Sequence, residues 1–213
     1  AILSAQEAHQ HSAFVRPSHR FGQGNPDTIL QHAENTVSGT LDIGGQEHMY
    51  LEGQVSLAVP CEENRMNIYT SSQHPSEVQK LVAEVLDVRL HHVMVDMRRM
   101  GGGFGGKETQ AAQWACIAAL LAQRNQRAVK LRLPRFVDMH VTGKRHPFSN
   151  AFDVAFDDKG KIMATRMEVN GICGHSPDLS DAIVDRAMFH VDNGYFLGDS
   201  DIVGHRLQTN MVS

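Results

Sequence analysis

Hydrophobic residues recur with a helical period in two stretches of this chain. Between Pro75 and Leu86 they form one apolar helix face, and a proline suits the first helical position. The residues of this face are Val78, Leu81, Val82, Val85 and Leu86. Residues 109–123 are rich in alanine and leucine and predict a second helix. A third, shorter helix is expected over residues 181–190.

Short apolar or alternating runs predict strands between and after these helices. The expected strands span residues 36–43, 48–59, 66–71, 93–97, 129–133, 152–156 and 162–169. The last two flank the sequence Asp-Asp-Lys-Gly at 157–160, which favours a hairpin turn. The order of helices and strands indicates mixed layers of both. Residues 1–35, rich in histidine, glycine, proline and polar side chains, are expected to be a linker or the end of a preceding domain, and residues 36–213 a truncated N-terminal part of one domain.

Composition excludes several classes of protein. The chain of 213 residues has a formal charge of −4 with acids and bases intermixed, so no basic tract indicates a nucleic-acid partner. Its longest apolar run, residues 114–122, is shorter than the ~20 residues of a membrane-spanning helix. Three widely spaced cysteines favour neither a disulfide framework nor an iron–sulfur cluster in this chain, which suits a cytoplasmic protein. The 13 histidines contain no HExxH motif, and a metal site with protein ligands is not expected.

The most informative stretch is the glycine-rich sequence Met-Gly-Gly-Gly-Phe-Gly-Gly-Lys-Glu at 100–108, between an expected strand and an expected helix. It satisfies G-x-G-x-x-G, but no acid follows between residues 109 and 137 to bind a ribose. It also resembles a phosphate-binding P-loop until Glu108, where that motif needs Ser or Thr. A nucleotide-binding module is therefore an alternative, although the sequence lacks the acid of the dinucleotide motif and the Ser or Thr of the P-loop. A tight strand-to-helix turn is the purely structural alternative.

Together with four further blocks, this stretch resembles the xanthine dehydrogenase and aldehyde oxidase family of molybdenum hydroxylases. The other blocks are Gly-Gly-Gln-Glu-His-Met-Tyr-Leu-Glu at 44–52, Thr-Gly-Lys-Arg-His-Pro-Phe at 142–148, Asp-Arg-Ala-Met-Phe-His at 185–190 and Arg-Leu-Gln-Thr-Asn at 206–210. All five occur in the order that the family has. The resemblance implies an α+β fold, with mixed β-sheets flanked by helices.

Five residues receive roles from this resemblance. Gln46 would hydrogen-bond near a ligand of the molybdenum, and Phe104 and Gly105 would line the cofactor with their backbone amides toward it. Glu108 and Arg186 would bracket a purine, where aldehyde oxidases carry apolar residues. The chemistry of a purine supports this assignment, because its ring nitrogens and oxygens need a hydrogen-bond acceptor, such as Glu108, and a donor, such as Arg186. Taken alone, Arg186 beside two aspartates on a helix would more often form a surface ion pair.

The resemblance implies hydroxylation of xanthine or hypoxanthine to urate with water as the oxygen source. An aldehyde or another N-heterocycle is the alternative substrate. The metal would be bound by molybdopterin rather than by side chains, and electrons would pass to 2Fe-2S and FAD partner subunits in a dimeric assembly. The general-base glutamate of the family is expected outside this chain. The 213 residues alone are thus expected to be inactive and to bind the cofactor weakly or not at all.

Overall fold

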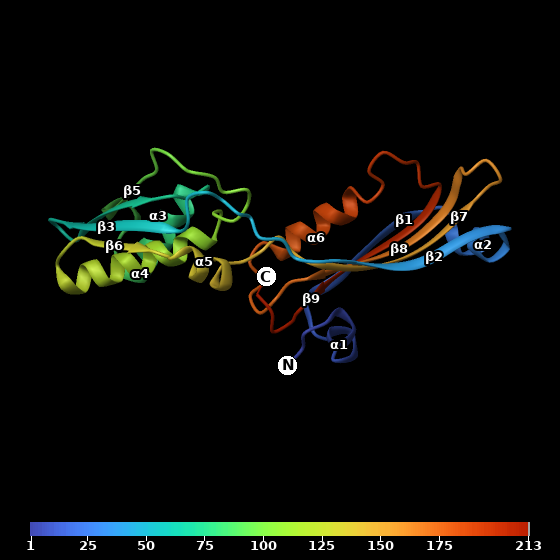
Figure 1. Cartoon of the computed structure of the whole chain (residues 1–213), viewed down its shortest axis with the longest axis horizontal. Helices are drawn as coiled ribbons and strands as arrows, with labels where there is room; N and C mark the ends of the chain where they lie inside the picture. The colour runs from blue at the N-terminus through green and yellow to red at the C-terminus, as the bar shows by residue number, and fades with distance from the viewer. Residues whose placement is uncertain (213) are drawn as a thin grey trace. The chain divides into compact units, whose positions relative to one another are not determined.

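The computed structural model describes residues 1–212, and the chain forms two compact units. Unit 1 comprises Ala1–Gln46 and the chain from His146 onward, whereas unit 2 comprises Glu47–Arg145. Each unit has its own sheet and its own helices (Figure 1). Unit 2 is therefore an insertion between two strands of the unit 1 sheet.

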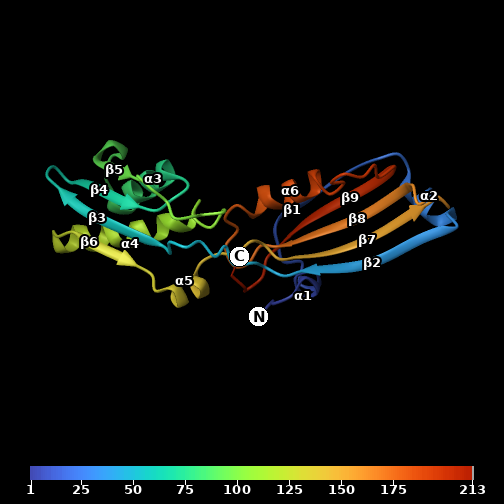
Figure 2. The ribbon, with the colours of Figure 1, turned by 45° about the horizontal axis from the view of Figure 1, so that its top comes forward.

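Unit 1 is built on a five-stranded sheet with the order β1-β9-β8-β7-β2 (Figure 2). Its strands are β1 (Phe14–Gln23), β2 (Asn35–Ile43), β7 (Phe148–Phe156), β8 (Ile162–Ile172) and β9 (Asp199–Leu207). Its helices are α1 (Ala5–Gln10), α2 (Pro26–His32) and α6 (Ser180–Phe189). Only β8 and β9 run parallel, since the chain crosses over through α6 between them. Val184 and Met188 of α6 pack on Val169 and Ile202 of these two strands.

Unit 2 carries a four-stranded mixed sheet with the order β5-β4-β3-β6. Its strands are β3 (Val55–Cys61), β4 (Arg65–Thr70), β5 (Val93–Asp96) and β6 (Val129–Arg132). Its helices are α3 (Pro75–Leu86), the 3-10 turn η1 (Leu90–His92), α4 (Gln110–Asn125) and α5 (Arg135–Val141). Alternate residues of β3 and β4, among them Ala58 and Ile68, are buried against α3 and α4. Alanines of α4 fill most of that contact, which explains the alanine-rich sequence.

Most predicted elements are present, and the α+β class of mixed sheets with flanking helices is confirmed. The hairpin forms at the predicted turn, where Asp157 Oδ1 accepts the N–H groups of Lys159 and Lys161, each at 2.9 Å. No helix within residues 1–212 combines the length and the apolar character required to cross a membrane.

Residues 1–35, expected to be a linker, instead contain α1, β1 and α2, and β1 pairs with β9 in unit 1. The strand was missed because β1 lies at a sheet edge and eight of its ten residues are exposed, so it has no apolar alternation. The strand expected over residues 48–59 begins only at Val55. The preceding residues use their polar groups to bind the glycine-rich loop, as described below.

Candidate functional site

The glycine-rich loop connects β5 to α4 in unit 2, as the sequence predicts. Three of its residues have positive φ: Gly102 at 97°, Phe104 at 54° and Gly105 at 93°. Such values are uncommon for residues with a side chain, so the backbone at Phe104 must be held by its surroundings. We call residues 100–108 the glycine loop.

Lys107 holds the glycine loop from inside unit 2. Its side chain is fully buried, and Nζ donates to the backbone oxygen of Glu52 and to Ser71 Oγ, each at 2.7 Å. The same ammonium lies 3.4 Å from Glu52 Oε2 and 4.7 Å from the centre of the Tyr50 ring. Burial lowers the pKa of Lys107, while the Glu52 carboxylate opposes that shift. This ammonium is engaged within the protein, which argues against a phosphate-binding role for Lys107.

Glu52 completes this contact as an acceptor. Burial raises its pKa, but hydrogen bonds from the Gly101 N–H and Ser71 and the charge of Lys107 lower it overall. The Gly101 N–H donates to Glu52 Oε2 at 2.8 Å, and Ser71 Oγ donates to the same oxygen at 2.6 Å. One ionised carboxylate therefore ties the start of the loop to β4 and to Lys107.

Gln73 and Gln54 bind the second half of the loop. Gln73 Oε1 accepts the N–H groups of Gly105 at 2.9 Å and Lys107 at 3.2 Å. Gln54 Nε2 donates to the backbone oxygen of Gly106 at 3.0 Å. The Gly105 amide, expected to face the cofactor, thus already has a partner in the protein. Within residues 1–212 the Phe104 N–H has none.

Several glycines of the loop are needed for close packing, Gly103 and Gly106 among them. A Cβ at Gly103 would lie 2.5 Å from Gln73 Oε1, and one at Gly106 would lie 2.8 Å from the side chains of His48 and Tyr50. Tyr50 is fixed in turn, since its hydroxyl donates to Asp138 Oδ1 at 2.6 Å. Burial raises the pKa of Tyr50 to about 12, with the Asp138 hydrogen bond adding to the shift. The run of glycines therefore has a packing function, which the sequence alone did not separate from ligand binding.

Three of the predicted site residues belong to the loop, and two of them, Phe104 and Gly105, lie on its outer side. Phe104 is 74% exposed, and a Cβ at Gly105 would meet only His48 Nε2, at 3.7 Å. Glu108 is half-buried just before α4, and its carboxylate has no hydrogen bond or ion pair with residues 1–212. The loop is thus fixed on its inner side, exposes an aromatic ring on the outer side, and ends in a carboxylate without a partner among residues 1–212.

Gln46 and Arg186 belong to unit 1, where Gln46 is exposed at the end of the first segment and Arg186 is exposed on α6. The surface ion pair considered for Arg186 does not form. Asp181 and Asp185 instead bind Arg206, a fully buried residue of β9 whose Nε donates to Asp181 at 2.8 Å. Within the described part of the chain, Arg186 has no hydrogen bond or ion pair. Convergence of the five predicted residues on one cleft stays a prediction.

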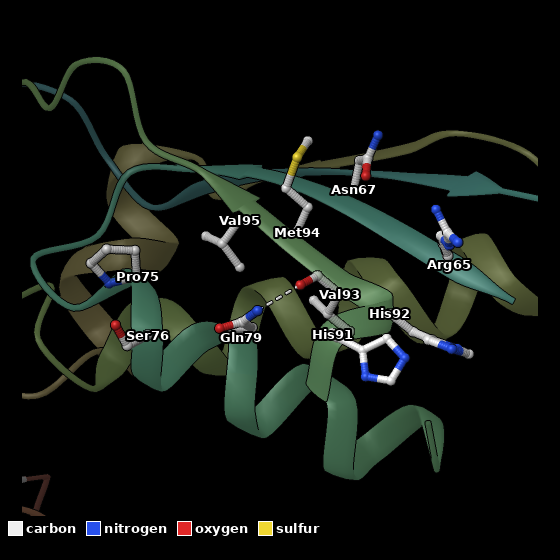
Figure 3. Close-up of a pocket in the computed structure, with 10 residues that line it drawn as sticks. All are labelled: Arg65, Asn67, Pro75, Ser76, Gln79, His91, His92, Val93, Met94 and Val95. Atoms are coloured by element: carbon white, nitrogen blue, oxygen red, sulfur yellow. Dashed lines mark hydrogen bonds between the residues drawn. The ribbon is translucent and has the colours of Figure 1, made fainter. Parts of the chain in front are cut away.

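A separate hollow of about 630 Å³ lies beside β5 and α3 in unit 2 (Figure 3). Gln79 of α3 closes part of its floor, where Nε2 donates to the backbone oxygen of Val93 at 2.8 Å. The rings of His91 and His92 meet edge to face at one end, 4.6 Å apart. None of the residues predicted for the site lines this hollow.

Residues 6–213 match the family model described as the molybdopterin cofactor-binding domain. The chain is 39% identical over 213 residues to xanthine dehydrogenase from Calliphora vicina and 38% identical over 214 residues to xanthine dehydrogenase/oxidase from Felis catus. Each comparison covers all of this chain and 16% of the relative. The chain therefore belongs to the molybdopterin cofactor-binding domain family, and the predicted resemblance to molybdenum-binding xanthine dehydrogenases is confirmed.

Solved structures of related proteins share the fold. An aldehyde oxidoreductase from Desulfovibrio gigas matches with a TM-score of 0.89 at 22% identity, covering 100% of this chain and 24% of that one. Quinoline 2-oxidoreductase from Pseudomonas putida 86 matches with a TM-score of 0.78 at 19% identity, over 94% of this chain and 26% of that one. At these identities the likeness shows the α+β fold alone.

Sequence reasoning missed the residues that hold the loop. Gln73 and Tyr50 were not identified as residues that hold the glycine loop, and Lys107 was considered only as a phosphate ligand. Its contacts to Glu52 and Ser71 span 55 and 36 residues, and no local pattern marks them. The one available signal was a lysine next to glycines without the Ser or Thr of a P-loop.

Proposed function

We propose that this chain is part of a molybdenum hydroxylase that converts xanthine or hypoxanthine to urate, with water as the oxygen source. Curated relatives at 34–39% identity are xanthine dehydrogenases, although the chain spans only 16% of their length. The observation that carries the substrate class is that Glu108 and Arg186 both lack a charge partner within residues 1–212. Charged side chains without partners at the surface are available to bind a polar ligand such as a purine. An aldehyde substrate would need neither the carboxylate nor the guanidinium.

The outer side of the glycine loop fits a role in lining the molybdenum cofactor. Phe104 would contribute an aromatic surface, and Gly105 would allow close approach because it has no side chain in the open space above it. The exposed Gln46 amide would hydrogen-bond to the cofactor. When bound, the cofactor supplies the redox centre at which the substrate carbon is oxidised. The Gly105 amide stays with Gln73, so the free Phe104 N–H is the better donor toward the cofactor.

Glu108 and Arg186 would orient the purine. The Arg186 guanidinium presents several donors in one plane and would stabilise negative charge that develops on a purine oxygen. The Glu108 carboxylate would hydrogen-bond to the ring at the opposite end. In the proposed enzyme the general-base glutamate comes from another part of the protein, and electrons leave through 2Fe-2S and FAD domains or subunits. We further propose that the assembled enzyme is dimeric and cytoplasmic, on the basis of the resemblance to this family.

The proposal is tested with the assembled enzyme that contains this chain, by measuring xanthine-dependent NAD reduction. Glu108→Ala and Arg186→Met should each lower kcat/KM by about 10²-fold, the usual effect of removing one transition-state contact. Matched controls are Glu77→Ala, at the start of α3, and Arg124→Met, exposed on α4; both should keep full activity. Oxidation of aldehydes or other heterocycles without xanthine turnover would replace the purine proposal with the alternative substrate class.

A further inference from the structure

Two histidines and a glutamate meet in unit 1, where α1 packs beside β8 and β9 (Figure 1). His9 lies on α1, Glu168 on β8 and His205 on β9. His9 Nε2 is 3.3 Å and His205 Nε2 is 3.7 Å from the same oxygen, Glu168 Oε1. One ligand atom from each of the three residues lies within 4.8 Å of the other two. All three side chains are partly buried.

These spacings suit one small divalent cation. Tetrahedral zinc has bonds of about 2.0–2.1 Å to imidazole nitrogen and carboxylate oxygen, which places neighbouring ligand atoms roughly 3.3–3.4 Å apart. The His9–Glu168 distance already equals that value, and the His205–Glu168 distance exceeds it by a few tenths of an ångström. We propose that His9, Glu168 and His205 bind one divalent transition-metal ion of the zinc class.

Neighbouring residues orient the ligands as metal sites require. Ser18 Oγ lies 2.6 Å from His205 Nδ1, which fixes the ring and turns Nε2 toward Glu168. Asn170 is paired in register with His205 on the adjacent parallel strand and lies two residues from Glu168, on the same face of β8. Its Nδ2 donates to Glu168 Oε1 at 3.0 Å. The carboxylate is therefore positioned from both sides.

Asn170 also provides a fourth donor atom. Its Oδ1 lies 2.7 Å from His9 Nε2, so without a metal ion His9 donates a hydrogen bond to it. Metal binding requires the other neutral tautomer: the proton moves through solvent from Nε2 to Nδ1, Nε2 binds the ion, and Asn170 Oδ1 or a water completes the tetrahedron. Imidazole nitrogen together with carboxylate oxygen favours zinc-class ions over magnesium or calcium, which prefer oxygen alone.

The site would stabilise the docking of the N-terminal helix. The helix α1 has only six residues and is attached to the sheet through a small apolar cluster. That cluster contains Ala5, Ala8 and Leu207. A metal ion bound by His9 and by the two strands would add a direct link between helix and sheet. Because the metal ion would bind only to the folded form, it would raise the melting temperature.

The test uses the full chain, freed of metal with EDTA and titrated with Zn²⁺ against a chromophoric chelator. Wild type should bind one equivalent, and His9→Gln and Glu168→Gln should each weaken that equivalent by more than ~10-fold, since even an outer-sphere partner contributes ~10–100-fold. Ser18→Ala should weaken it by about tenfold. The matched control is His11→Gln, an exposed histidine that caps the end of α1 outside the cluster, and it should bind as wild type does.

Melting curves separate loss of binding from misfolding. At a Zn²⁺ concentration of 100 times the Kd, wild type should melt roughly 5–10 °C higher than in EDTA. Glu168→Gln should show no such rise, while it melts in EDTA within a few degrees of wild type. Absence of a bound equivalent in wild type, or equal binding by wild type, His9→Gln and Glu168→Gln, would overturn the proposal.

Discussion

The buried ammonium of Lys107 should be the main stabilising contact of the glycine loop, and Lys107→Met tests this. Methionine keeps most of the side-chain volume but removes the donors to the Glu52 backbone oxygen and to Ser71. A hydrogen bond to a charged group contributes about 1.5–3 kcal/mol, so two give roughly 3–6 kcal/mol. Burying the methionine side chain returns about 1–3 kcal/mol. From the middle of each range we expect a net loss of about 2.5 kcal/mol in the free energy of unfolding of unit 2.

The assay is urea unfolding followed by tryptophan fluorescence. Trp114 is the only tryptophan of the chain and lies in α4, so its emission reports on unit 2. Lys130→Met is the control, because Lys130 is exposed on β6 and its replacement should change stability by less than ~0.5 kcal/mol. A loss below about 1 kcal/mol for Lys107→Met would refute the reasoning. It would mean that desolvation of the ammonium cancels the free energy of its contacts.

Three further predictions concern other contacts. Gln73→Ala removes the acceptor of the Gly105 amide and should cost about 1–2 kcal/mol; hydrogen exchange of that amide should accelerate, and unchanged exchange would contradict the assignment. Burial lowers the pKa of His146 in the folded protein, so the contribution of this residue to stability should be constant above pH ~6.5 and fall as the pH drops below it, because the unfolded chain then binds more protons. His146→Gln should reduce that slope in melts between pH 7 and 5, and an unchanged slope would assign it to other groups. Arg206→Met should lower the melting temperature through a loss of about 2 kcal/mol, whereas Arg186→Met should not, and equal effects would contradict the ion-pair assignment.

The sequence predicted the fold best where burial imposes a period. The helix of residues 75–86 begins at the predicted Pro75 and ends at the last residue of its apolar face, because that face packs on a sheet. Elements without such an apolar face were missed: β1 is mostly exposed, and α5 buries only one residue, the polar Asp138. The strand β9 was missed as well, because its alternating buried positions include Ser200, Gly204 and Arg206 rather than a run of apolar residues. The order of the strands within each sheet could not be predicted from the sequence either. The pairing of β1 with β9 joins residues almost 200 positions apart, for example Phe14 with Leu207.

The candidate site, too, could be predicted from the sequence only in part. The glycine loop and its position before a helix follow from local sequence, and the structure has both. The partners that hold the loop do not follow, because Gln73 and Glu52 are ordinary polar residues until the fold brings them next to Gly105 and Gly101. The His9 cluster was missed for the same reason, since its three ligands come from an unpredicted helix and from two strands.

The two sides of the glycine loop imply different constraints on its residues. Gly103 and Gly106 have no room for a side chain, and Lys107 has its donors directed into unit 2, so these positions determine the shape of the loop. The side chain of Phe104 is exposed and the carboxylate of Glu108 has no partner among residues 1–212, so neither group holds the loop in place. A backbone that is fixed from within can present such groups without further ordering cost when a ligand binds. Ligand specificity should therefore depend on Phe104 and Glu108, and loop stability on the glycines and Lys107.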